Sequence, residues 1–249
     1  MKLRLKYISI VLVFITNIVA QTDVNIEHFG KMYSFDNLPI EKWNNEYNVN
    51  LDTSFYNFAM KSSLQLGGGC SASFVSPNGL IMTNHHCVRD AILPIQNKGE
   101  DFLKDGFYAE EKFLERRISG MYVDQLIDIK DITKEILDKQ FDTVNDSSKY
   151  DYVKTKIKSL EEGYSQKYNA ICKIVVMYSG AKFVLHVYKR YKDIRLVMVP
   201  EFQIASTGWD WDNFTYPRYE LDFAFIRAYD SLGIPKTNNY FKWNTEGAK

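Results

Sequence analysis

The chain has 249 residues, which is enough for one large domain or two small ones with a sizeable core. Lysine plus arginine equals aspartate plus glutamate at 31 each, so the charge balance indicates neither a nucleic-acid nor an anionic-membrane partner. Aromatic residues make up 15% of the chain, which argues for an ordered globular fold and against disorder.

The first 20 residues have the pattern of a secretory signal peptide. Three basic residues within the first six precede a largely apolar stretch, Tyr7 to Ala20, which is short for a membrane span. We therefore expect cleavage after Ala20 and a mature chain in the periplasm or outside the cell. A membrane anchor is the alternative. Export would place the cysteines in an oxidising compartment, where disulfides form.

A short helix is predicted from Asp52 to Gln65, where apolar residues recur at roughly helical spacing. Three glycines follow, Gly67 to Gly69. They resemble a phosphate-binding loop only superficially, because the lysine and the strand-to-helix context of such loops are missing. A close approach of the backbone at the start of a strand explains them better.

The next segment has the pattern of a β-hairpin. Two apolar runs, Ser73 to Val75 and Leu80 to Thr83, flank the turn Ser76-Pro77-Asn78-Gly79. Folding about the Asn-Gly pair places Cys70 opposite Cys87, close enough for a disulfide that closes the base of the hairpin.

This disulfide would hold His86 at the end of a strand, and a catalytic base needs such fixing. Two other interpretations stay open. His85 and His86 could bind zinc with Cys70 and Cys87, although adjacent residues on a strand point to opposite faces and no zinc-binding spacing is present. The two histidines could also be purely structural. We favour His86 as a general base.

Mixed charge with apolar residues at threes and fours predicts a helical insertion over about residues 100–168. Within it we expect a helix at Asp101 to Arg117, a strand at Met121 to Ile129 and a helix at Ser147 to Tyr168. The apolar stripes of these helices are interpreted as packing faces.

Three further strands are predicted at Ala170 to Tyr178, Lys182 to Tyr191 and Ile194 to Val199, all rich in β-branched and aromatic residues. Cys172 lies in the first of them and is expected to be a buried free thiol. His186 lies in the second and is interpreted as structural.

A polar and aromatic loop leads into an alternating strand, Leu221 to Ile226. Asp222 stands among leucine and phenylalanine there, and burying a carboxylate is costly unless a hydrogen-bonding partner compensates. An imidazole N–H is such a partner. Asp222 is therefore our candidate for the acid that orients His86, and an exposed aspartate on an edge strand is the alternative.

These segments together resemble the bacterial dipeptidyl-peptidase 7 and dipeptidyl-peptidase 11 family of chymotrypsin-fold serine peptidases. The resemblance rests on GGGCSASFVSPNGLIMTNHHC at 67–87, the aromatic-rich segment at 30–39, Tyr-Lys-Arg-Tyr at 188–191 and Pro-Arg-x-x-x-Asp-Phe at 217–223. It implies an exported enzyme that removes dipeptides from peptide N-termini. It also implies that His86 is the base and Asp222 the orienting acid.

The same resemblance implies a mainly β fold with helical insertions, namely the first barrel of a chymotrypsin-like, trypsin-type double-barrel fold. Asn213 stands where the family has an asparagine that holds the free amine of the substrate. Phe214 follows it where members commonly have tryptophan, so a ring is kept but an N–H is lost. Peptides with a free N-terminus are the implied partners, with a homodimer at full length and with neither metal nor cofactor.

A nucleophile is missing from this sequence. No serine stands in the Gly-x-Ser-Gly-like turn that such a peptidase needs, and 27 residues after Asp222 are too few for a second barrel. We therefore expect an amino-terminal portion that lacks the second barrel and is inactive alone. The alternatives are a naturally truncated, non-catalytic secreted protein that binds peptides, and an endopeptidase completed by a separate chain.

Overall fold

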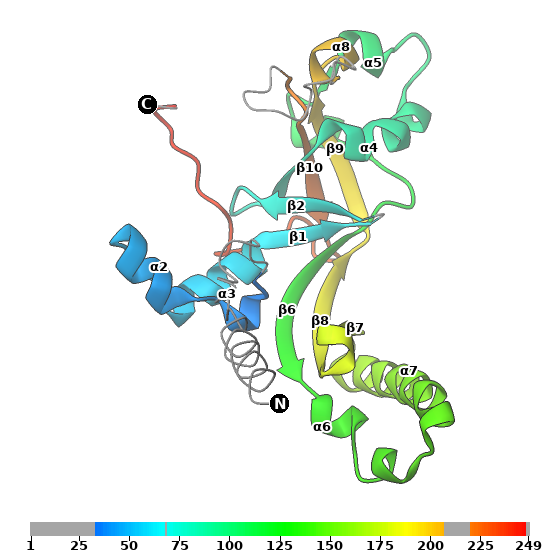
Figure 1. Cartoon of the computed structure of the whole chain (residues 1–249). Helices are drawn as coiled ribbons and strands as arrows, with labels where there is room; N and C mark the ends of the chain where they lie inside the picture. The colour runs from blue at the N-terminus through cyan, green and yellow to red at the C-terminus, as the bar shows by residue number, and fades with distance from the viewer. Residues whose placement is uncertain (1–32, 68, 207–219, 248–249) are drawn as a thin grey trace, which may run out of the picture. The chain divides into compact units, whose positions relative to one another are not determined.

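The computed structural model describes residues 33–67, 69–206 and 220–247. The chain divides into two compact units, Met1–Pro39 and Ile40–Lys249. The described part of the first unit holds a 3₁₀ turn at Phe35–Asn37. The second unit holds every other helix and strand that the structure describes (Figure 1).

One antiparallel sheet of ten strands forms the frame of the second unit in its described parts. The strands are β1 (Ser63–Leu66), β2 (Cys70–Phe74), β3 (Leu80–Thr83), β4 (Phe107–Tyr108), β5 (Arg116–Arg117), β6 (Val123–Asp131), β7 (Ile171–Met177), β8 (Lys182–Tyr191), β9 (Asp193–Val199) and β10 (Ala224–Tyr229). They pair in the order β4-β9-β10-β3-β2-β1-β6-β8-β7, and β5 also pairs with β9. The fold is therefore mainly antiparallel β, as expected. The predicted closed barrel is not confirmed, because this order has two ends.

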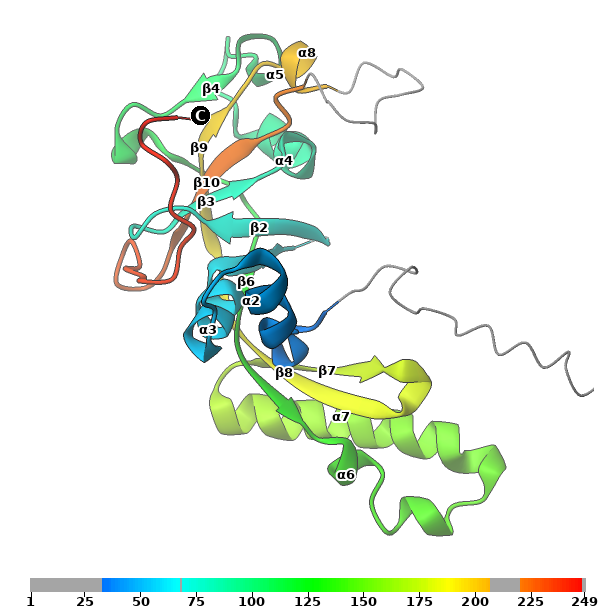
Figure 2. The same cartoon turned by 60° about the vertical axis from the view of Figure 1, so that its left-hand side comes forward.

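The second unit also contains helices outside the sheet, and α7 runs alongside the β7–β8 hairpin (Figure 2). They are α2 (Ile40–Tyr47), α3 (Thr53–Ser62), α4 (His85–Ile92), α5 (Phe102–Asp105), α6 (Thr133–Ile136), α7 (Lys149–Tyr168) and α8 (Phe202–Ala205). The predicted helix at Asp52 to Gln65 is confirmed as α3 but ends earlier. Asp52 caps its first turn, accepting from the N–H groups of Ser54 and Phe55. The chain then becomes β1, which buries Leu64 and Leu66 on alternate positions.

The predicted hairpin is confirmed as β2 and β3, with a different register. Ser73 pairs with Met82, two residues from the position that folding about the Asn-Gly pair requires. The turn closes one step earlier, because the N–H of Val75 bonds to the carbonyl of Leu80 at 2.9 Å. Gly79 takes a φ of 67°, the left-handed conformation that suits glycine in such a turn.

The helix predicted from Asp101 to Arg117 is wrong. Asp101 does cap a helix, α5, but this helix ends at Asp105 because Gly106 takes a φ of 70°. A side chain at Gly106 would also meet the carbonyl of Val199 at 2.9 Å. From there the chain pairs with β9 through β4 and β5. A local helical pattern has been overridden by strand pairing.

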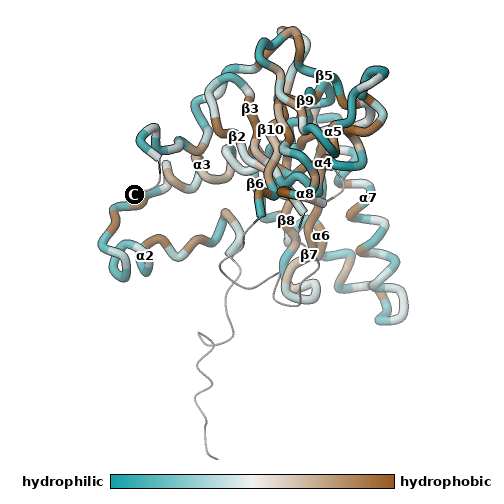
Figure 3. Tube along the Cα trace, turned by 90° about the horizontal axis from the view of Figure 1, so that it is seen from above, coloured by the Kyte–Doolittle hydropathy of each residue, from teal (hydrophilic) through white to brown (hydrophobic). Residues whose placement is uncertain are grey.

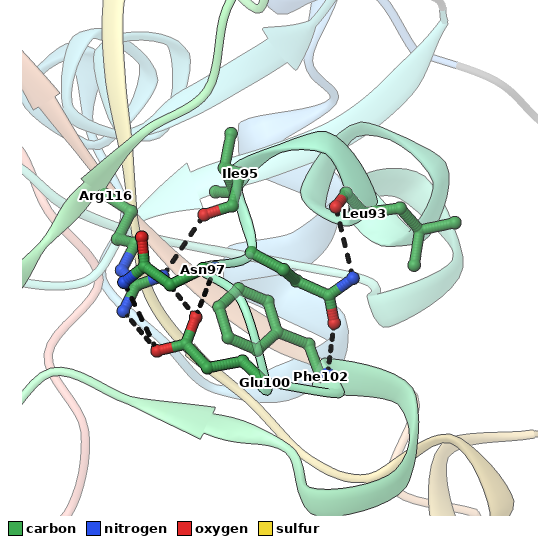
Figure 4. A network of polar contacts seen from close by, with 7 residues as sticks. Leu93, Ile95, Asn97, Glu100, Phe102 and Arg116 are labelled. Carbon is green, nitrogen blue, oxygen red and sulfur yellow. Dashed lines mark hydrogen bonds and ion pairs between the residues drawn. The ribbon is translucent and has the colours of Figure 1, made fainter.

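An ion pair connects the two ends of this segment (Figure 4). Arg116 makes two hydrogen bonds to the Glu100 carboxylate, which also accepts the N–H of Asn97 at 2.7 Å. The guanidinium lies over the rings of Phe102 and Phe107, 5.4 and 5.2 Å from their centroids. Arg116 pulls the pKa of Glu100 down to about 2, chiefly through these hydrogen bonds.

The predictions for the chain from residue 121 onward agree better with the structure. The strand at Met121 to Ile129 is confirmed as β6 and the helix at Ser147 to Tyr168 as α7. The three strands that follow are confirmed as β7, β8 and β9. Within the expected helical insertion at 100–168, β4 and β5 take the place of most of the helix expected at 101–117, whereas the expected strand and the expected long helix are present as β6 and α7.

Two apolar clusters stabilise the second unit. The larger lies among β1, β2, β3, β9, β10 and α4 and includes Phe74, Ile81 and Ile226, each fully buried. The smaller lies between α7, α6 and the β7–β8 hairpin, where Cys172 is a buried free thiol as predicted. In Figure 3 the strands β9 and β10 are mainly brown, in agreement with their buried apolar residues.

Candidate active site

His86 is placed by the junction between β3 and α4. The strand ends at Thr83, Asn84 stays extended, and His85 begins the helix. The expectation that both histidines lie on a strand is therefore wrong. The helix still directs them apart: His85 is 1% exposed, whereas the His86 side chain is 60% exposed. His86 therefore has an accessible imidazole, and His85 belongs to the interior.

Asp222 reaches the same place from the other end of the chain. It lies just before β10, which begins at Ala224 and not at Leu221 as predicted. Ala224 pairs with Thr83, the last residue of β3. Since paired residues on neighbouring antiparallel strands are about 5 Å apart, this register brings Asp222 beside the first turn of α4.

The Asp222 carboxylate is enclosed by donors from the β3–α4 junction. One oxygen, Oδ2, lies 2.7 Å from His86 Nδ1 and accepts from the Asn84 amide at 3.1 Å. The other oxygen, Oδ1, accepts the backbone N–H of His86 at 3.0 Å. Only 12% of the Asp222 side chain is exposed. These bonds hold the carboxylate and the imidazole in one fixed arrangement.

This arrangement sets the tautomer of His86. An ionised carboxylate only accepts hydrogen bonds, so the proton shared with Asp222 belongs to His86 Nδ1. The lone pair then lies on Nε2, where it can accept a proton from another group. The N–H of His86 lies in the first turn of α4, where free N–H groups favour a negative charge. The site therefore combines the His86 imidazole, held in place as a proton acceptor, with the largely buried carboxylate of Asp222 on its other side.

Asn84 is the residue of this site that the sequence interpretation missed. Its side-chain amide donates to both the main-chain carbonyl and the carboxylate of Asp222, at 3.0 and 3.1 Å. It occupies the N-cap position of α4 without making a capping bond. Asparagine before a helix is a recognisable signal, but it predicts a local cap. Its long-range partner could not be read from the sequence.

A disulfide joins Cys70 of β2 to Cys87 of α4, with 6.2 Å between the two Cα atoms. The predicted bridge is therefore confirmed, although Cys87 belongs to the helix and not to the hairpin strand. Closing a loop of this length contributes about 3 kcal/mol in the chain-entropy model. The sulfur atoms lie within 4.8 Å of a ring nitrogen of His86. They are bonded to each other, so they offer no thiolate to a metal ion.

His85 lies in the interior beside Phe202, with 6.3 Å between the ring centres. Burial lowers the pKa of His85, and the nearby charge of Asp222 opposes that effect in part. Its Nε2 atom has no hydrogen-bond partner among the residues that the structure describes. His85 therefore acts as a neutral core residue, which agrees with the choice of His86 as the exposed candidate.

Some predictions fall outside the described residues. Asn213 and Phe214, expected to hold the substrate amine, lie there, as does the expected signal peptide at 1–20. Among the residues that are described, no helix has the length and apolar character needed to span a bilayer.

Fold and site together define a class of protein. The chain is mainly antiparallel β, and a disulfide-linked strand–helix junction holds a histidine against an aspartate as in a Ser-His-Asp triad. The chain belongs to the peptidase S46 family, whose model matches residues 28–249. This agrees with the resemblance inferred from its motifs.

Its relatives include named dipeptidyl-peptidases. Dipeptidyl-peptidase 7 of Phocaeicola vulgatus is 33% identical over 180 residues, which covers 70% of this chain and 25% of the relative. The Asp/Glu-specific dipeptidyl-peptidase of Flavobacterium psychrophilum is 32% identical over 162 residues, covering 65% of this chain and 23% of the relative. The chain therefore spans about a quarter of the length of the relatives it matches.

A solved structure shows the same fold. The crystal structure of Porphyromonas endodontalis DPP11 in complex with substrate matches with a TM-score of 0.73 and 25% sequence identity. The match covers 88% of this chain and 35% of that protein. The helices and antiparallel strands of this chain thus correspond to one part of a larger peptidase.

Proposed function

We propose that this chain supplies the His–Asp half of the catalytic site of an exported, serine-type dipeptidyl-peptidase. In this proposal His86 is the general base and Asp222 holds it in the correct tautomer. The nucleophilic serine is supplied by sequence outside these 249 residues. Peptides with a free N-terminus are the substrates, and Asn213 with Phe214 receives their amine.

One observation carries the proposal: the 2.7 Å contact between Asp222 Oδ2 and His86 Nδ1. In acyl transfer the histidine takes the proton of the serine hydroxyl as the serine oxygen attacks the peptide carbonyl, and returns it to the leaving amine. Asp222 stabilises the imidazolium between these steps. The exposure of His86 allows a serine to approach Nε2, while the buried carboxylate stays behind the ring.

The strand pairings also support the barrel that the family resemblance implies. β8 pairs with β6 and β9 pairs with β10, and only Lys192 separates β8 from β9 in the chain. We therefore propose that six strands close into a barrel. Its strands are, in order, β1, β2, β3, β10, the nearly continuous β9–β8 segment and β6.

The test uses the product of the complete reading frame at the source locus and a panel of chromogenic dipeptide substrates. We expect dipeptide release that falls about 10⁴-fold in Asp222→Asn, since that change favours the wrong tautomer. His86→Ala should fall at least as far. His186→Ala makes the same substitution in β8 and should keep its activity.

The result also separates the alternatives. A complete enzyme whose activity survives His86→Ala would refute the proposed roles. Dipeptide release by the 249-residue chain alone would refute the claim that the nucleophile lies elsewhere. A stop codon directly after position 249 at the locus would favour the non-catalytic peptide-binding protein instead.

A further inference from the structure

The free edge of β7 is protected by α7 over most of its length. In β7, Cys172 and Ile174 direct their backbone N–H groups away from β8. The N–H of Cys172 bonds to Ser165 Oγ at 3.2 Å, and the N–H of Ile174 bonds to Glu161 Oε1 at 2.8 Å. These two helix residues are four apart, one turn of α7, so each turn covers one outward group of the strand. Such caps prevent other chains from pairing with an edge strand.

The third outward position on this edge is Val176, since outward groups alternate along a strand. Val176 pairs with Phe183, whose own N–H and carbonyl bond on the opposite side, to Thr133 and Ile132 at 2.9 and 3.0 Å. Both backbone groups of Val176 therefore point to the open edge. Val176 is also half exposed.

The next turn of α7 has no cap for this position. One turn before Glu161 the helix carries Ile157, whose side chain has no acceptor atom. No hydrogen bond from the N–H of Val176 to a helix residue is present in the described part of the chain. The caps therefore end at Ile157, where the helix position that faces β7 is apolar. The backbone N–H and carbonyl of Val176 stay available for pairing at this edge.

A cavity of about 530 Å³ opens at this point. Its walls are mainly apolar and include Leu137, Val153, Ile157 and Phe183. Three of these also pack against the smaller core cluster, so the cavity continues that core outward. A volume of this size holds one or two side chains of a peptide. The cavity therefore offers an apolar receptor beside an open strand edge.

The charged residues that line the cavity are both cations, Lys149 and Lys154. Lys149 is already paired with Asp146 at 2.8 Å and lies over the ring of Phe141, 5.2 Å from its centroid, whereas Lys154 makes no ion pair with any residue that the structure describes. No acidic residue is part of the lining. A ligand that brings a negative charge to this rim is electrostatically complementary.

We propose that this cavity binds an extended peptide segment with an apolar side chain next to an acidic residue. The peptide pairs with the N–H and carbonyl of Val176, inserts its apolar side chain between α7 and the β7–β8 hairpin, and turns its carboxylate toward Lys154. A peptide is favoured over a small carboxylate because one peptide residue satisfies both backbone groups of Val176. The proposal is independent of His86 and Asp222.

The test is a nuclear magnetic resonance titration of the whole, isotope-labelled chain with the peptide acetyl-Glu-Val-Leu-Val-Asp-amide. The blocked N-terminus removes the amine that the proposed catalytic function requires, so the two proposals fail separately. We expect saturating shifts of the backbone amides from Val175 to Tyr178. No shift at millimolar peptide, or shifts confined to α4 and β10, would overturn the proposal.

Two pairs of variants sharpen the test. Ile157→Glu places an acceptor opposite Val176, following the pattern of Glu161, and should weaken binding about tenfold or more, which is 1.4 kcal/mol. Ser159→Glu makes the same charge change on an exposed position of α7 and should leave binding unaltered. Lys154→Ala should weaken binding two- to fivefold at low salt, roughly the effect of one rim charge, and its control is Lys158→Ala.

The same measurements also distinguish other possible occupants of the β7 edge. Equal binding by Ile157→Glu and Ser159→Glu, with both folded by circular dichroism, would refute pairing at Val176. Shifts of the same amides that depend on protein concentration without peptide would assign the edge to a second copy of the chain, and would equally refute the proposal.

Discussion

The buried ion pair between Arg227 of β10 and Glu115 allows a quantitative prediction of stability. Arg227 Nε donates to Glu115 Oε1 at 2.7 Å, and the side chains of the two residues are 11% and 2% exposed. Tyr229 donates to the other carboxylate oxygen at 2.8 Å. Through these bonds, β10 holds the segment that carries β4 and β5 against the sheet. The same strand begins two residues after Asp222.

Glu115→Ala leaves the Arg227 guanidinium buried without its anion. Removing one partner of a buried pair costs about 3 to 5 kcal/mol. Counting bonds gives a similar figure, since two hydrogen bonds to a charged group are worth about 1.5 to 3 kcal/mol each. We therefore expect the free energy of unfolding in urea to fall by about 4 kcal/mol. Glu111→Ala, an exposed glutamate of the same segment, should change it by less than about 0.5 kcal/mol.

The pKa of Tyr229 gives a second test of the same contact. Burial, and then the hydrogen bond to Glu115, raises the pKa of Tyr229 to about 12. Removing the carboxylate should lower this pKa part of the way to its ordinary value near 10, which an ultraviolet titration detects. The double variant Glu115→Leu with Arg227→Met should be more stable than Glu115→Ala, because no unpaired charge is left. A loss below about 1 kcal/mol in Glu115→Ala would refute this reasoning.

Two further predictions concern other contacts. Cys70→Ser should lower the free energy of unfolding by about 3 kcal/mol. A reductant should destabilise the wild type but not the variant. Equal sensitivity of the two proteins to reductant would contradict this prediction. Arg116, together with the N–H of Asn97, lowers the folded-state pKa of Glu100 from its ordinary value of 4.5 to about 2. Its ionised form therefore stabilises the fold above pH 4.5, and this contribution is lost as the pH falls toward 2. Glu100→Gln should remove that part of the acid dependence of the melting temperature, and an unchanged profile would disprove the assignment.

The sequence alone was sufficient for features that depend on neighbouring residues. The Pro-Asn-Gly turn predicted the β2–β3 hairpin, and the apolar stripe predicted α7 to within two residues of its start. The pairing of Cys70 with Cys87 followed from the hairpin even though its register was misjudged. The bridge tolerates this error because Cys87 lies beyond the strand, in the first turn of α4.

Tertiary structure decided whatever depends on partners distant in the chain. The segment from Asp101 to Arg117 has a helical pattern, yet pairing with β9 and the left-handed Gly106 prevail over it. Asn84 would be expected to cap its own helix, but its amide reaches Asp222, 138 residues away. Sequence patterns record the local preferences of the backbone, whereas the register between β3 and β10 brings His86 to Asp222 and completes the candidate site.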